Sequence, residues 1–203
     1  MTLGGSKRDV VLVDGGGTNI GSVRYALQRL GLDAEMTADL ERIFAASHVI
    51  LPGVGAAGPG MKKLREAGLT QVLRGLRQPL LGVCLGMQLL YERSEEGDTE
   101  CLGLLPGAVA HFPPGDGLRI PHMGWNLLRT ERDDPLLADV GGEPYAYFVH
   151  SYAAPVTSAT IASTEHGSRF SAVVRQGNIC GMQFHPERSA AVGAQLLRNF
   201  LEL

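Results

Sequence analysis

The chain has 203 residues, 44% of them hydrophobic and 19% charged, which is typical of a globular protein with one large core. A net charge of −3 gives no basic surface for nucleic acid, and no apolar run reaches the roughly 18 residues of a membrane span. Three cysteines, an odd number, argue against a disulfide framework. The first apolar run, Val10–Val13, is too short for a signal-peptide core. A cytoplasmic location is therefore expected.

The first half of the chain alternates short apolar runs with segments of helical periodicity. The apolar runs predict strands at Val10–Asp14, Val49–Leu51 and Leu80–Cys84. The helical spacing predicts helices at Ser22–Leu30, Met61–Ala67 and Leu69–Leu76, and a further helix that begins with Met87–Tyr91. Because strands without polar alternation are buried on both faces, this half predicts a mostly parallel sheet with helices on either side.

The second half changes to short strand candidates separated by Gly, Pro, Asp and Ser, which favours antiparallel additions to the sheet. The candidates are Gly107–Phe112, Leu118–Pro121, Tyr145–Val149, Thr160–Ser163 and Ala172–Arg175. A longer strand follows at Asn178–Phe184, and Ala190–Leu203 has the periodicity of a closing amphipathic helix. With no internal repeat or linker in the sequence, we expect one α/β domain over residues 1–203.

A candidate nucleophile lies in the segment Gly82-Val83-Cys84-Leu85-Gly86, between a predicted strand and a predicted helix. This is the pattern of a nucleophile elbow, in which flanking glycines let a strained turn close and expose the central side chain. The following helix would direct its amides and its positive dipole end at the sulfur and favour the thiolate. The alternative is a buried, inert cysteine, and that interpretation suits Cys180, which lies inside a strand pattern. Cys101 has no evident partner.

A thiolate nucleophile needs a general base, usually a histidine held by a third group. Among six histidines, only His185 ends a long buried-strand pattern and has a carboxylate close by, in the sequence His185-Pro186-Glu187. Proline restricts the backbone between the two side chains, so Glu187 can orient the imidazole. The residues alone thus indicate an activated thiol, Cys84, with His185 and Glu187 as a triad.

Several segments resemble a known family. GVCLGMQ at 82–88 and QFHPE at 183–187 are similar to the class I (triad) glutamine amidotransferases. PGVGAAGPGM at 52–61, PHMGWN at 121–126 and YFVHSY at 147–152 narrow the resemblance to the glutaminase subunits of imidazole glycerol phosphate synthase, over essentially the full chain. The resemblance implies the class I glutamine amidotransferase fold and a glutaminase activity within histidine biosynthesis.

The same resemblance assigns roles within a glutamine site, with no metal and no cofactor. Cys84 would form a glutamyl thioester with L-glutamine, His185 would protonate the departing ammonia and activate water, and Glu187 would hold His185. The oxyanion would be met by the Leu85 amide and, after reorientation of a peptide, by an amide of the Gly53-Val54 turn. The residues expected to bind the substrate are Gly55, Gln88, Ser151 and Tyr152.

The resemblance also implies a partner. In this family ammonia passes directly to a (β/α)₈ cyclase subunit in a heterodimer, which yields imidazole glycerol phosphate and aminoimidazole carboxamide ribotide. The interface candidates are Asn19, Met123, Trp125 and Arg188. For Trp125, the alternative to an interface position is a position in the hydrophobic core. Arg188 stands where many relatives have lysine. The Gly15–Gly17 turn also departs from the family pattern. A phosphate-binding P-loop is rejected for this turn, because the Lys-Ser/Thr of that motif is missing.

Three alternatives compete with this interpretation. Another class I amidotransferase is disfavoured by PHMGWN and by the lack of an attached synthetase domain. A cysteine peptidase or α/β-hydrolase-like enzyme would usually carry its acid before its histidine, whereas Glu187 follows His185. A non-catalytic binding module is disfavoured because all three triad residues are present.

Overall fold

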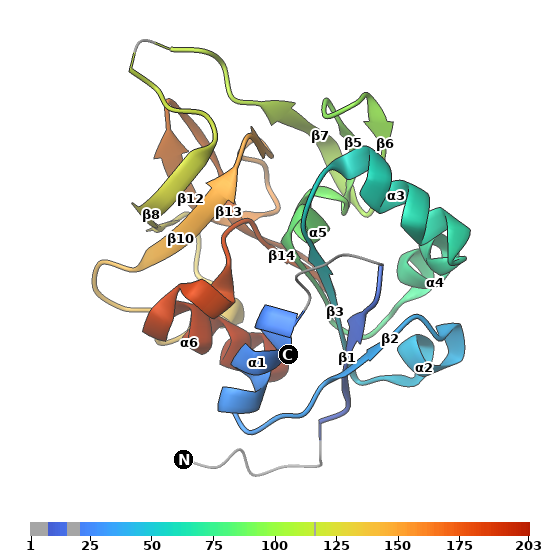
Figure 1. Ribbon diagram of the computed structural model, residues 1–203. Helices are drawn as coiled ribbons and strands as arrows, with labels where there is room; N and C mark the ends of the chain where they lie inside the picture. The colour runs from blue at the N-terminus through green and yellow to red at the C-terminus, as the bar shows by residue number, and fades with distance from the viewer. Residues whose placement is uncertain (1–7, 16–20, 116) are drawn as a thin grey trace.

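Parallel strands form the middle of the molecule, as the apolar runs of the first half predict (Figure 1). The computed structural model describes residues 8–15, 21–115 and 117–203. The central sheet has eight strands in the spatial order β2 (Glu35–Thr37), β1 (Val10–Val13), β3 (His48–Gly53), β4 (Leu80–Cys84), β14 (Ile179–Met182), β13 (Ser168–Gln176), β12 (Thr160–His166) and β9 (Arg129–Thr130). Neighbours from β2 to β14 run parallel, and the last three strands continue the sheet antiparallel. A mostly parallel sheet with added antiparallel strands is confirmed.

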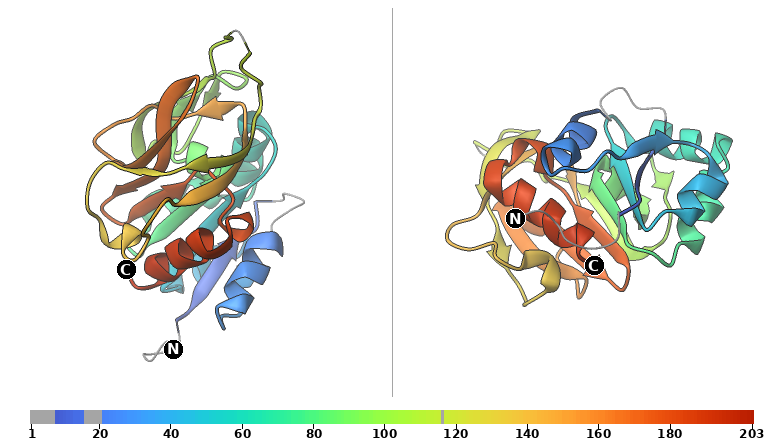
Figure 2. Two further views of the ribbon diagram at one scale, coloured as in Figure 1. Left: turned by 90° about the vertical axis from the view of Figure 1, so that its left-hand side faces the viewer. Right: turned by 90° about the horizontal axis from the view of Figure 1, so that it is seen from below.

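Helices cover both faces of this sheet (Figures 1 and 2). One face carries α1 (Gly21–Arg29) and α6 (Ala190–Leu201); the other carries α2 (Leu40–Ala45), α3 (Ala57–Glu66) and α4 (Leu69–Gly75). The position of β1 between two layers of helices explains why its sequence is an unbroken apolar run. Val10 and Leu12 enter the core under α1 and α6, while Val11 and Val13 enter the core under α3 and α4. Among the described residues, no helix has the length and apolar character to cross a membrane.

Two smaller sheets stand beside the central one. The first contains β11 (Tyr152–Ala153), β7 (Leu105–His111), β5 (Tyr91–Ser94) and β6 (Thr99–Glu100). The second is an antiparallel pair of β8 (His122–Leu127) and β10 (Tyr145–His150), on the side of the molecule away from α3 and α4 (Figure 1). Two short 3₁₀ turns, η1 (Pro135–Leu137) and η2 (Pro186–Arg188), complete the described elements.

The prediction of a helix that begins with Met87–Tyr91 was wrong about both the start and the length of the helix. The observed helix α5 covers only Leu85–Gln88, and the chain then turns into β5. The reason lies in the backbone hydrogen bonds. The carbonyl of Leu90 accepts from the amides of Leu104 and Leu105, so a distant segment takes the place of the next helical turn.

The prediction of a strand at Leu118–Pro121 was also wrong. The Leu118 amide donates back to the carbonyl of Gly115 in a turn, and the strand of this region, β8, begins one residue later, at His122. The candidates Gly107–Phe112 and Tyr145–Val149 do form strands, β7 and β10, but these belong to the smaller sheets. Both segments mix buried and exposed positions, and this pattern alone does not show which sheet a strand joins.

Candidate active site

Cys84 is the last residue of β4 and adopts a conformation that side chains rarely take, with φ 53° and ψ −113°. The glycines around it allow the close packing of this turn. A Cβ on Gly86 would lie 1.8 Å from the carbonyl oxygen of Leu51 in β3, and one on Gly82 would lie 2.6 Å from the carbonyl oxygen of Gly86. Glycine at positions 82 and 86 is therefore what allows Cys84 to stand in an elbow between β4 and α5. Since α5 has only four residues, its dipole is smaller than that of the helix expected there.

His185 and Glu187 come together in the turn that follows β14. Nδ1 of His185 lies 3.0 Å from Oε1 of Glu187, and both side chains are almost completely shielded from solvent. Strand β10 and the start of α6 hold this turn in place. The amide of His185 donates to the carbonyl of Tyr147, and the Ser189 hydroxyl donates to the carbonyl of His185 while accepting from the Tyr147 amide.

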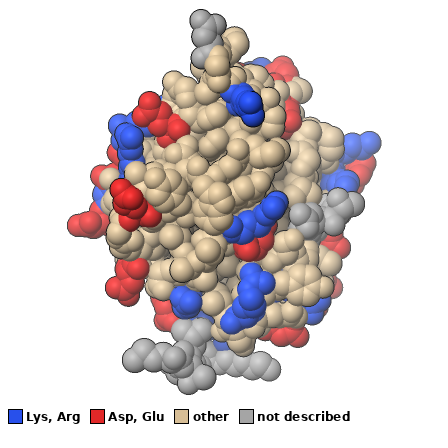
Figure 3. All heavy atoms as spheres, turned by 60° about the vertical axis from the view of Figure 1, so that its left-hand side comes forward, with Lys and Arg blue, Asp and Glu red and all other residues tan. Residues whose placement is uncertain are grey.

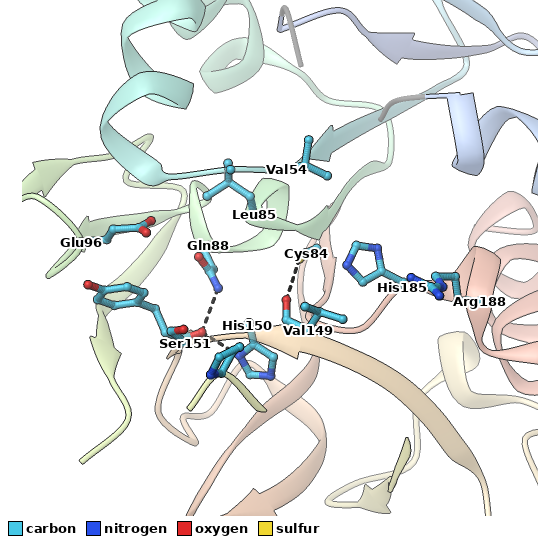
Figure 4. Close-up of a pocket in the computed structure, with 13 residues that line it drawn as sticks. Val54, Cys84, Leu85, Gln88, Glu96, Val149, His150, Ser151, His185 and Arg188 are labelled. Carbon is cyan, nitrogen blue, oxygen red and sulfur yellow. Dashed lines mark hydrogen bonds between the residues drawn. The ribbon is translucent and has the colours of Figure 1, made fainter. Parts of the chain in front are cut away.

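The His185 imidazole is stabilised in its charged form. Burial alone would lower its pKa, but hydrogen bonds and charge interactions with Cys84 and Glu187 outweigh burial and raise the pKa to about 10. Figure 4 shows His185 next to Cys84 at the edge of one cavity. With Nδ1 directed at Glu187, Nε2 is the nitrogen left for Cys84. An imidazolium beside a sulfur favours the thiolate that attacks a carbonyl.

Cys84 opens into a cavity of about 430 Å³. The lining residues to which the sequence assigned a role in the site are Val54, Gly55, Cys84, Leu85, Gln88, Ser151, Tyr152 and His185, and Arg188, which was expected at the interface, lines the cavity as well. Four others were missed: Glu96, Pro121, Val149 and His150. Glu187 and Gly53 do not line the cavity; Glu187 lies behind His185, and Gly53 is paired with Cys84 across β3 and β4. The cavity thus gathers residues from both halves of the chain.

The turn expected to complete an oxyanion hole follows β3 directly. Gly53 lies against α5, since a Cβ there would be 2.6 Å from the Gly86 amide nitrogen and 2.9 Å from the Leu85 Cβ. Gly55 has φ +94°, a conformation that glycine adopts without strain. Val54, between them, faces the cavity near Leu85 (Figure 4).

A chain of amide side chains connects the cavity wall to the sulfur. Gln88 Nε2 donates to the carbonyl of Tyr152 at 2.8 Å and to Gln183 Oε1 at 3.1 Å. Gln183 Nε2 in turn lies 4.0 Å from Cys84 Sγ, within reach of a hydrogen bond to sulfur. Because both protons of the Gln88 amide are used, its Oε1 is the atom available to a ligand. Gln183 was part of the recognised QFHPE segment, but its contact with sulfur could not be inferred from the sequence.

Glu96 brings a negative charge to the cavity from the turn between β5 and β6. Its Oε2 accepts from the amide of Ala57, the first residue of α3, at 2.7 Å, which fixes the carboxylate at the cavity rim. The sequence shows Glu96 only as one of several acidic residues in a loop. No short motif marks it, because the contact depends on two segments 39 residues apart.

The interface candidates that the structure describes, Met123, Trp125 and Arg188, lie near one another around Tyr147 and β8. Met123 and Trp125 on β8 are 64% and 53% exposed, so the core alternative for Trp125 was wrong. The Arg188 guanidinium lies over the Tyr147 ring at 4.6 Å, and the Trp125 ring meets the same tyrosine edge-on at 5.9 Å. Asn19, and Gly16 and Gly17 of the unusual N-terminal turn, lie outside the described residues.

The cysteines without a proposed role, Cys101 and Cys180, are buried free thiols, and the core position expected for Cys180 is confirmed.

Comparison with known proteins identifies the class. Residues 11–203 match the family model described as glutamine amidotransferase class-I, so the chain belongs to the class I glutamine amidotransferase family and is an enzyme of that class. A solved structure described as a glutamine amidotransferase superposes with a TM-score of 0.73 at 25% identity, covering 95% of this chain and 97% of that one. The structure of PurLQS from Thermotoga maritima shares the fold, with a TM-score of 0.71 at 20% identity over 97% of this chain and 98% of that one.

Relatives of higher identity point to one branch of the family. Imidazole glycerol phosphate synthase subunit HisH of Xanthomonas axonopodis pv. citri (strain 306) is 60% identical over 195 residues, which cover 96% of this chain and 98% of the relative. The subunit of the same name from Xylella fastidiosa (strain Temecula1 / ATCC 700964) is 56% identical with the same coverage. Similarity of this extent includes the segments around Cys84 and His185.

Proposed function

We propose that this chain is the glutaminase subunit of an imidazole glycerol phosphate synthase. The observation that carries the proposal is the arrangement of a strained, cavity-facing Cys84 next to a His185 that is held by Glu187. The family supplies the substrate class, glutamine, and the names of the relatives supply the enzyme complex. We place the reaction in the cytoplasm, which suits an enzyme with three buried free thiols.

The reaction proceeds through a thioester. The Cys84 thiolate attacks the side-chain carbonyl carbon of L-glutamine, and the electron pair of the carbonyl moves to oxygen. As the tetrahedral intermediate collapses, the C–N bond breaks and His185 gives its proton to the departing nitrogen, which leaves as ammonia. His185, now neutral, takes a proton from water, whose oxygen attacks the thioester. Glutamate is released, and the thiolate and imidazolium are restored.

The developing oxyanion needs hydrogen-bond donors, and the Leu85 amide at the start of α5 is the first. The second is an amide of the Gly53-Val54 turn, brought toward the cavity by rotation of a peptide. Gly55, at φ +94°, gives the turn the freedom for such a rotation. Each donor to an oxyanion contributes about 10²–10³-fold in rate, so the position of this turn controls the activity.

The remaining polar groups of the cavity recognise the amino-acid end of glutamine. The Glu96 carboxylate attracts the α-ammonium group, since a charge-assisted hydrogen bond is about twice as strong as a neutral one. Gln88 Oε1 and the backbone of Ser151 and Tyr152 complete the site together with Gly55. This combination favours a zwitterionic amino acid over a simple amide.

We assign the face around β8 to the cyclase partner. Figure 3 shows a broad surface on this side of the molecule with few charged side chains. Met123 and Trp125 provide exposed apolar anchors of the kind enriched at interfaces, and Arg188 lies between this face and the cavity. Asn19 is the fourth interface candidate. Ammonia that entered water would be protonated and lose its nucleophilicity, so direct transfer within a heterodimer explains why the glutaminase would need a partner at its cavity.

Glutamate release tests the proposal. The lone chain should hydrolyse glutamine slowly, and addition of the cyclase subunit with its nucleotide ligand should increase the rate by at least tenfold, on the order of one oxyanion donor. Full activity without the partner would contradict the coupling. If the co-purified complex released no glutamate, the assignment as a glutaminase would be wrong.

A further inference from the structure

His150 lines the cavity and His122 lies next to it, and the reaction described above uses neither of these buried histidines. His150 is the last residue of β10 and His122 is the first of β8, and the two are paired across the strands. Their rings pack among the aromatic side chains of Phe112, Phe148 and Phe170. A polar ring in such surroundings is costly unless its nitrogens are hydrogen-bonded, and all four of these nitrogens have a partner within reach.

The hydrogen bonds fix where the protons are. Nδ1 of His150 lies 2.8 Å from the carbonyl oxygen of Tyr152, and because a carbonyl only accepts, this nitrogen carries the proton. Nε2 of a neutral His150 is then an acceptor. It lies 3.2 Å from Nδ1 of His122, so that nitrogen must carry the proton of the second ring.

Asn126 fixes the other end of this series. Its Oδ1 accepts from the Leu127 amide at 2.9 Å, and its Nδ2 donates to the carbonyl of Glu165 at 2.8 Å, which sets the orientation of the amide. The same Nδ2 lies 3.3 Å from Nε2 of His122, which must therefore be an unprotonated acceptor. Only one arrangement of protons satisfies every contact from Asn126 through both imidazoles to Tyr152.

The electrostatics agree with two neutral rings. Burial lowers the pKa of His150 to about 3 and that of His122 to about 4. A positive charge on any neighbouring histidine, His185 included, also disfavours a charge on His150. His166 stacks on His122 with ring centroids 4.2 Å apart and acts in the same direction.

We propose that His150 and His122 are positioning residues: with Asn126 they form a one-way hydrogen-bond series that holds the Tyr152 carbonyl in place for glutamine binding. The carbonyl of Tyr152 is the point where the series meets the site, since it also accepts from Gln88 Nε2 at 2.8 Å. Gln88 continues to Gln183 and so to the sulfur of Cys84. The proposal rests on the proposed function, in which Ser151, Tyr152 and Gln88 bind glutamine.

Nuclear magnetic resonance of the full chain tests the proton positions without any activity. In ¹⁵N-labelled protein, two-bond ¹H–¹⁵N spectra distinguish an Nδ1–H ring, an Nε2–H ring and an imidazolium. Both His150 and His122 should be neutral Nδ1–H rings from pH 6 to pH 8, with signals assigned by loss in His150→Asn and His122→Phe. An Nε2–H or charged form of either ring would overturn the proposal.

Kinetics of the complex with the cyclase separates positioning from packing. In His150→Asn the amide nitrogen lies near the position of Nδ1 and keeps the bond to Tyr152, whereas in His150→Gln it lies near that of Nε2 and loses the bond. His150→Gln should raise KM for glutamine about 5- to 10-fold with a smaller change in kcat, the effect of one lost hydrogen bond. His150→Asn should stay within about twofold of the wild type.

Equal KM values for the two variants, or a higher KM in His150→Asn, would overturn the proposal, because a packing role would make the smaller asparagine the poorer replacement. Ammonia-dependent product formation serves as the control for folding and assembly. A wild-type complex without glutamine-dependent activity would instead contradict the proposed function, and the spectra would still decide the proton arrangement.

Discussion

The carboxylate of Glu187 lies 3.0 Å from Nδ1 of His185, although only Pro186 separates the two residues in sequence. The Glu187 side chain is 6% exposed, so the interaction is little weakened by solvent. Its second oxygen, Oε2, has no hydrogen-bond partner among the described residues. The negative charge is therefore directed at the imidazole, and it acts with Cys84 to raise the pKa of His185.

Glu187→Gln tests that electrostatic role. The amide keeps the size of the side chain but removes its charge, so the pKa of His185 should fall and kcat for glutamine should drop by about 10²-fold. The alkaline limb of the pH–rate profile should move to lower pH, in the same direction as the pKa. Steady-state glutaminase assays of the complex measure both effects, with ammonia-dependent activity as the control. An unchanged kcat and profile would show that the charge has no catalytic role.

Gly193→Ala tests the support of the triad turn by α6. A Cβ on Gly193 would lie 2.0 Å from the carbonyl oxygen of Pro186, so the substitution forces η2 and α6 apart. We expect the free energy of unfolding to fall by about 1–3 kcal/mol and glutaminase activity to fall with it. The matched control is Gly75→Ala at the end of α4, where a Cβ meets no atom within 4 Å. Equal unfolding temperatures for the two variants would contradict the account.

The two buried histidines predict a loss of stability in acid. His150 and His122 have folded pKa values of about 3 and about 4, whereas an unfolded histidine titrates near about 6.5. Below pH 6.5 the unfolded chain binds protons that the folded chain does not, so the free energy of unfolding falls toward pH 4. Two such protons give a slope of up to about 2.7 kcal/mol per pH unit.

Urea unfolding between pH 5 and pH 7 measures this slope. His122→Phe keeps an aromatic ring and should reduce the slope by about half of the two-proton value. The same slope in the variant and the wild type would contradict the assignment. His185 acts in a different window: with a folded pKa of about 10, its contribution is complete below pH 6.5 and is lost as the pH rises toward 10.

Trp125→Ala tests the partner face. Because the side chain is 53% exposed, its removal should leave the unfolding temperature nearly unchanged while weakening association with the cyclase about 10- to 30-fold. Phe44→Ala is the matched control, since Phe44 is 60% exposed on α2, away from β8. Isothermal titration calorimetry with the cyclase gives both affinities. A similar loss in both variants, or none in Trp125→Ala, would place the interface elsewhere.

Local patterns were sufficient to predict the elements around Cys84, the proposed nucleophile. The apolar run Leu80–Cys84 predicts β4 with its observed bounds, and flanking glycines predict the elbow because steric crowding in that turn is a property of a few neighbouring residues. The pair His185 and Glu187 was equally accessible, since a single proline fixes their separation. Helix α6 was predicted to within two residues of its end.

Other features depend on contacts that no local pattern carries. Glu96 reaches the cavity only because β5 and β6 bring it to the first turn of α3. The four-residue α5 ends where residues from a distant segment take over the carbonyl of Leu90. His150 and His122 come from segments whose resemblance was recognised, but their pairing follows from the register of β8 and β10.

The Cys84→Ala complex tests whether Cys84 releases ammonia from glutamine for use by a partner subunit. Product formation by the assembled complex should be measured with glutamine and, separately, with ammonium salts at alkaline pH. We expect activity with glutamine to disappear while activity with ammonia remains at the wild-type level. Retention of glutamine-dependent activity would show that Cys84 is not the nucleophile, and loss of both activities would show that it supports the structure of the complex instead.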